Sequence, residues 1–105
     1  MEADWKKFSA MIPVWRERYL AERNTRIVTI LTNPKKTETE RFWDAEAQIQ
    51  KEAKALRRCL DDVSRSKMSL RLMEMRAIGM LKREDLADFS AELQKQVFDD
   101  PPRAG

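Results

Sequence analysis

The chain has 105 residues and a net charge of +3, with no histidine, one cysteine and two glycines. This inventory excludes the usual proton shuttle at neutral pH, zinc sites built on histidine or four cysteines, and a glycine-rich phosphate loop. Apolar residues make up 42% of the chain and charged residues 37%, so we expect a modest core under a strongly solvated surface.

The same composition predicts a soluble intracellular protein, and we expect it in the cytoplasm. One cysteine permits no internal disulfide. No apolar run approaches the roughly 18 residues of a transmembrane helix, and the acidic N-terminus lacks an apolar signal core. We expect a single helical domain over residues 1–98 and a flexible tail over residues 99–105.

Apolar residues recur every three or four positions near the N-terminus, which predicts one face of an amphipathic helix from about residue 4 to residue 32. They are Trp5, Phe8, Ile12, Trp15 and Tyr19. Pro13 lies inside this pattern, so either the helix kinks there or a longer helix starts with Pro13 in its first turn. The β-branched stretch 27–32 would suit a strand, but no second strand candidate exists to pair with it.

A capping box marks the start of the second helix, because Thr37 is followed three residues later by Glu40. Apolar residues then follow one face: Phe42, Ala45, Ile49, Ala53, Leu56, Leu60 and Val63. The connection from Asn33 to Lys36 is short, so we expect the two long helices to form an antiparallel hairpin.

Two shorter helices are predicted after the hairpin. The third runs from Ser66 to Ile78, with Ser64 or Ser66 as its N-cap and Gly79 as a left-handed stop. The fourth begins near Lys82 and has an acidic first turn. Its buried face holds Leu86, Phe89, Leu93 and Val97. The predicted fold is all-α: a long antiparallel helical hairpin with two shorter C-terminal helices packed along it, a small helical bundle.

The third helix is apolar on two sides, so it needs cover on two sides. One side holds Met68, Leu72 and Met75, and the other holds Leu70, Met73, Ala77, Met80 and Leu81. Either both sides are buried within the subunit, or one of them meets a second copy or another protein. We expect Leu70, Met73, Ala77 and Met80 to contribute to such an interface.

Six aromatic residues in the two long helices have three alternative roles. They are Trp5, Phe8, Trp15, Tyr19, Phe42 and Trp43. They would suit a protein-binding surface or a platform for unpaired bases, but their helical spacing favours packing at the open end of the hairpin.

The most basic region surrounds the turn between the second and third helices. Its cations are Lys54, Arg57, Arg58, Arg65, Lys67 and Arg71. A phosphate backbone or an acidic partner would dock there, although Asp61 and Asp62 weaken the field. The alternative is ordinary stabilisation of helix ends by cations.

No catalytic constellation is recognisable, so we expect no enzyme activity, no metal and no cofactor. Arg57 and Arg58 would lower the pKa of Cys59, but no histidine is present to complete a nucleophile pair. We therefore expect Cys59 to be a small apolar residue near the buried face.

The function expected from the sequence is a non-enzymatic interaction or regulatory module that self-associates as a dimer, without membrane contact. The alternative is a weak nucleic-acid-binding accessory protein that uses the basic turn.

Overall fold

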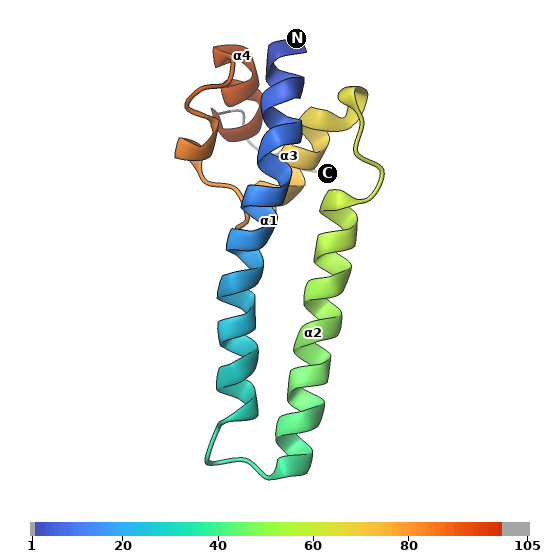
Figure 1. Ribbon diagram of the computed structural model, residues 1–105, viewed down its shortest axis with the longest axis vertical. Helices are drawn as coiled ribbons and strands as arrows, with labels where there is room; N and C mark the ends of the chain where they lie inside the picture. The colour runs from blue at the N-terminus through green and yellow to red at the C-terminus, as the bar shows by residue number, and fades with distance from the viewer. Residues whose placement is uncertain (1, 100–105) are drawn as a thin grey trace.

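The computed structural model describes residues 2–99, which form a hairpin of two long helices with shorter helical segments packed against its open end (Figure 1). The long helices are α1 (Glu2–Leu31) and α2 (Glu38–Leu60). The shorter segments are η1 (Arg65–Lys67), α3 (Met68–Ala77), η2 (Arg83–Leu86), α4 (Ala91–Gln94) and η3 (Lys95–Asp99). The molecule measures 52 × 31 × 24 Å. The predicted all-α hairpin is confirmed.

α1 continues as one helix through Pro13 and through the β-branched stretch 27–32 as far as Leu31. Two threonine hydroxyls at this end bond to the carbonyl four residues earlier, as threonines within a helix can. Thr29 Oγ1 donates to the Thr25 carbonyl at 3.1 Å, and Thr32 Oγ1 donates to the Val28 carbonyl at 2.8 Å. The stretch 27–32, for which the sequence left helix and strand open, is therefore helical as far as Leu31.

α2 starts at the predicted capping box. The Glu40 N–H donates to Thr37 Oγ1 at 3.1 Å, and the Thr37 N–H donates to Glu40 Oε1 at 2.9 Å. Arg41 Nε also donates to the Asn33 carbonyl at 2.7 Å, which ties the connecting loop to the first turn of α2. These local contacts set the antiparallel return of the chain.

α3 begins later than predicted, because the 3-10 turn η1 precedes it. Ser64 holds the N-cap position of η1, but its side chain caps no N–H, and the N-cap position of α3 is Lys67. Neither Ser64 nor Ser66 is therefore the side-chain cap that was predicted for α3. The predicted stop is confirmed, since Gly79 has φ +82°. The Gly79 N–H bonds to the Arg76 carbonyl at 3.1 Å and the Met80 N–H to the Met75 carbonyl at 2.9 Å, which is a Schellman ending.

The predicted continuous fourth helix is wrong, because the chain there divides into η2, α4 and η3. Ser90 causes the break: it is the N-cap of α4, and its Oγ accepts from the Leu93 N–H at 3.3 Å. The four apolar residues predicted for this segment are all buried nonetheless: Leu86, Phe89, Leu93 and Val97. The predicted flexible tail lies outside the described residues except for Asp99, which is in η3.

The core occupies the open end of the hairpin. Its buried members are Phe8, Trp15, Tyr19, Cys59, Met68, Leu72, Met75, Met80, Leu81, Leu86, Phe89, Leu93 and Val97. In the closed half of the hairpin, residues 20–51, Ala45 alone is buried. The C-terminal elements therefore cover only one end of the two long helices.

Candidate interaction surface

The two apolar sides predicted for the third helix have different fates. Met68, Leu72 and Met75 are buried, which confirms that this side packs within the subunit. On the other side, Leu70 is 51% exposed and Met73 41%, and Ala77 is exposed as well. Met80 and Leu81 are 1% and 3% exposed, because the turn at Gly79 folds them back into the core. As a correction, Met80 and Leu81 are not part of this exposed row.

The apolar row predicted for α2 lies to one side of the true contact with α1. The buried positions of α2 are Ala45, Glu52 and Cys59, which are spaced seven residues apart. Phe42 is 58% exposed and Ile49 48% exposed. The apolar row predicted for α2 is thus rotated away from the side of α2 that faces α1.

Together with apolar residues of α1, the residues of this row form one apolar face along the hairpin, which we call the hairpin face. Ala45 of α2 and Arg23 of α1 serve as reference positions for the sides of the two helices that face each other. At about 100° per residue, the α2 members of the hairpin face lie about 20–80° round the helix from Ala45, all in one rotational direction. The α1 members lie about 40–80° round their helix from Arg23, in the same direction. Because α1 and α2 are antiparallel, equal rotations bring both rows to one side. The members are Leu20, Ile27, Leu31, Phe42, Ile49, Ala53, Leu56 and Leu60, and all are exposed or half-buried. The half-buried Leu56 and Leu60 also pack in part against the core.

The opposite side of the hairpin is polar. Rotation the other way from the same reference positions reaches Glu22, Arg26, Thr29, Asp44, Gln48 and Lys51. Phe8 and Trp15, which pack in the core, lie in this second direction too. α3 accordingly passes behind α1 in Figure 1, on the side away from the hairpin face.

A buried polar cluster separates the core from the closed half of the hairpin. Glu52, 8% exposed, accepts hydrogen bonds from the Tyr19 hydroxyl and from Gln48 Nε2. Arg23 lies 4.5 Å over the Tyr19 ring, 3.6 Å from Glu52 Oε2, and donates to the Ile78 carbonyl at 3.1 Å. Burial, and then the bond to Glu52, raises the pKa of Tyr19 to about 12. Sequence analysis missed this cluster, because Glu52 lies midway between the apolar residues Ala45 and Cys59 on the buried side of α2.

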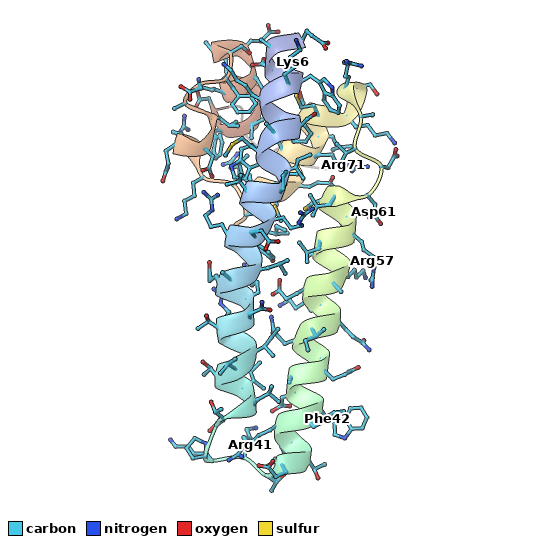
Figure 2. The ribbon with its side chains drawn as sticks, in the orientation of Figure 1. Lys6, Arg41, Phe42, Arg57, Asp61 and Arg71 are labelled. Atoms are coloured by element: carbon cyan, nitrogen blue, oxygen red, sulfur yellow. The ribbon has the colours of Figure 1, made fainter. Side chains whose placement is uncertain are left out.

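The aromatic residues divide between core and surface. Phe8, Trp15 and Tyr19 are buried, as core packing predicts. Phe42 lies near the closed end of the hairpin (Figure 2). Phe42 and Trp43 are 58% and 60% exposed, and their rings lie edge to face at 5.0 Å. This second pair lies outside the core.

The predicted basic patch is only partly available. Arg65 pairs with Glu2 at 2.9 Å, Lys67 pairs with Asp62, and the Arg71 side chain, 12% exposed, pairs with Glu74. The remaining cations are Lys54, Arg57 and Arg58; all are exposed, and none forms an ion pair with a residue of 2–99 (Figure 2).

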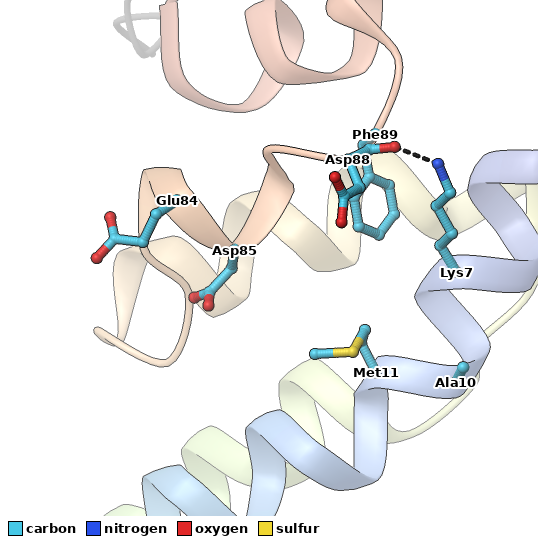
Figure 3. A pocket seen from close by; sticks show the side chains of 7 residues that line it. All are labelled: Lys7, Ala10, Met11, Glu84, Asp85, Asp88 and Phe89. Carbon is cyan, nitrogen blue, oxygen red and sulfur yellow. Dashed lines mark hydrogen bonds between the residues drawn. The ribbon is translucent and has the colours of Figure 1, made fainter.

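A cleft of about 390 Å³ lies between α1 and η2 (Figure 3). Its lining residues are Lys7, Ala10, Met11, Glu84, Asp85, Asp88 and Phe89. Lys7 donates to the Asp88 carbonyl, and Arg18 binds both oxygens of Asp85 at 2.7 and 2.8 Å. Burial alone would raise the pKa of Asp85, but the bonds from Arg18 and the Lys82 N–H lower it. The cleft thus offers two uncommitted carboxylates and no nucleophile beside a base.

The single thiol is shielded from chemistry. Cys59 is fully buried, as predicted, and burial raises its pKa to about 11.

Within residues 2–99, no three acidic, cysteine or histidine side chains are grouped to hold a metal ion. Nor does any helix of this part of the chain combine the length and apolarity that a membrane span requires. No protein family, curated protein or solved structure matches the chain.

Proposed function

We propose that this protein is a non-enzymatic interaction module that self-associates as a dimer. The observation that carries the proposal is the group of large apolar side chains left exposed outside a complete core. On the hairpin face, Leu31, Phe42 and Ile49 are 45%, 58% and 48% exposed. Burying such side chains in an interface gains about 25 cal/mol for each Å² of apolar surface removed from water.

The size of the hairpin face suits a weak, reversible dimer. It extends over 19 residues of α2 and 12 residues of α1, or about 28 Å and about 18 Å at about 1.5 Å per residue. Two helices about 9 Å apart present a width of about 10 Å each. The projected area is therefore about 450 Å² per copy, which is the size of a weak or transient interface.

The test is the mass in solution, by light scattering on a size-exclusion column at moderate salt. A mass near twice the 12.4 kDa of the chain is the expected result. A monomer at every concentration up to about 100 μM would overturn the proposal, since the exposed surface would then gain nothing from self-association.

Two variants assign the surface. Ile49→Lys puts a charge in the hairpin face, and Met73→Glu puts one in the exposed row of α3. Both side chains are at least 41% exposed, so the fold should tolerate either change. We expect Ile49→Lys to give a folded monomer and Met73→Glu to remain dimeric. Lys51→Glu, on the polar side of the hairpin, is the matched control and should leave the mass unchanged.

A second candidate is weak nucleic-acid binding, favoured by the unpaired state of Lys54, Arg57 and Arg58 within residues 2–99. Binding through these cations falls steeply with salt, because each phosphate contact releases counterions. Titration of labelled single-stranded DNA at 50 and 200 mM salt measures it. Absence of binding at the lower salt would remove this candidate.

A further inference from the structure

We propose that the partner on the hairpin face is a second copy laid antiparallel to the first, with α2 against α2 and α1 against α1. The two hairpins would then make one four-helix bundle, and their open ends would point in opposite directions. This inference rests on the proposed self-association, and it adds the surface and the orientation.

The composition of α2 is suited to lying against itself. Its apolar row runs from Phe42 to Leu60 and has its midpoint at Lys51, and antiparallel packing centred there exchanges residues equally distant from that point. Phe42 and Leu60 each lie about 13–14 Å from this midpoint at about 1.5 Å per residue, so each large side chain meets the other. Ile49 meets the smaller Ala53 in the same way, and both lie on the hairpin face.

Two charged residues beside the apolar row would also meet each other across the antiparallel dimer. Glu46 and Arg57 lie about 8 Å and about 9 Å from the midpoint of this row, on opposite sides of it. Both also lie about 100–120° round the helix from Ala45, in the direction of the hairpin face. An antiparallel partner would therefore place Glu46 beside Arg57 of the other copy, twice in each dimer.

The orientation is measured by a spin label at the closed end. Lys35 lies in the connecting loop and is exposed, and its side chain makes no ion pair within residues 2–99, so Lys35→Cys should fold normally. Native Cys59 is fully buried with a raised pKa, so the unaltered protein should stay unlabelled and serve as the control. Each tip lies about 20 Å from the centre of the hairpin face, which gives about 40 Å between labels in the antiparallel dimer. A parallel dimer would place them within about 25 Å.

A charge exchange tests the contact itself. Glu46→Arg should weaken the dimer about tenfold, because it creates two like-charge contacts. Arg57→Glu should do the same, and the two changes together should restore the dissociation constant to within about twofold. Circular dichroism of each variant shows whether the helices are retained, and Lys51→Glu should again have no effect.

The outcomes separate the two proposals. A monomer would defeat the proposed function and this inference together. A dimer with labels near 25 Å would leave self-association standing and overturn the antiparallel arrangement. A dimer that Ile49→Lys does not dissociate would place the interface elsewhere and overturn the inference as well. A distance near 40 Å with recovery in the double charge variant would establish it.

Discussion

Asp4 connects the first turn of α1 to the start of α4 and should stabilise the fold far more than a surface carboxylate would. It is 3% exposed and accepts two hydrogen bonds, from the Ser90 N–H at 2.9 Å and from Ser90 Oγ at 2.6 Å. The Ser90 hydroxyl accepts in turn from the Leu93 N–H. Asp4→Ala would thus remove the carboxylate and loosen the cap of α4 in one step.

The magnitude follows from these bonds. A hydrogen bond to a charged group contributes about 1.5–3 kcal/mol, and Ser90 is only half-buried, so water replaces part of the loss. We expect Asp4→Ala to lower the free energy of unfolding by about 2–4 kcal/mol. At about 4–5 °C per kcal/mol for a chain of this size, Tm should fall by about 8–20 °C. Asp4→Asn keeps one acceptor oxygen and should lose about half as much.

Urea unfolding followed by tryptophan fluorescence and circular dichroism measures the effect, at one protein concentration because association also stabilises the chain. Ser90→Ala and the double variant complete a mutant cycle. Coupling of at least about 1 kcal/mol is expected for groups in direct contact. A loss below about 0.5 kcal/mol for Asp4→Ala, which is usual for a surface position, would refute the reasoning.

Three further predictions follow from backbone geometry and from pKa values. Gly79→Ala should destabilise by about 1–2 kcal/mol in urea unfolding, because φ is +82° there while the nearest atom to the new Cβ, Arg23 Nη2, leaves room at 3.7 Å; an unchanged midpoint would contradict it. The pKa of Asp85 is lowered, so its pairing with Arg18 stabilises the fold above the ordinary value of 3.8 and is lost as the pH falls below it. Arg18→Gln should therefore flatten the acid limb of the stability curve, and an unaltered limb would count against the pairing. The pKa of Tyr19 is raised from 10.0 to about 12, so stability should fall as the pH rises through that window, and Tyr19→Phe should remove that loss. Absorbance at 295 nm during alkaline titration checks the last prediction, which fails if the tyrosinate appears at pH 10 in the folded protein.

The parts of the fold that sequence analysis predicted well depend on neighbouring residues. The capping box at Thr37 and Glu40 and the glycine stop at Gly79 act within a few positions, so the short pattern carries the information. The break in the fourth helix depends in part on Asp4, which is 86 positions away from Ser90. No local pattern reveals a contact of that separation, so the burial of Asp4 was not predicted.

The candidate surface was predicted only in part, because it too depends on contacts between residues that are distant in the sequence. The second apolar side of α3 was predicted, but Met80 and Leu81 of that side turn into the core. The hairpin face was not found, because the apolar row of α2 was expected to meet α1. Glu52 accounts for the error: a carboxylate at the contact position is acceptable only with Tyr19, Gln48 and Arg23 beside it, and two of these come from the other helix.

The uneven burial along the hairpin implies that its two ends have different dynamics. Backbone amides in the closed half are held mainly by the helices themselves, since Ala45 alone is buried between residues 20 and 51. Segments with few buried contacts open locally without unfolding of the whole domain. Hydrogen exchange in that half should therefore be fast in the isolated chain, and it should slow sharply when a partner covers the hairpin face. The open end should exchange slowly in both states, so the closed half alone would report association.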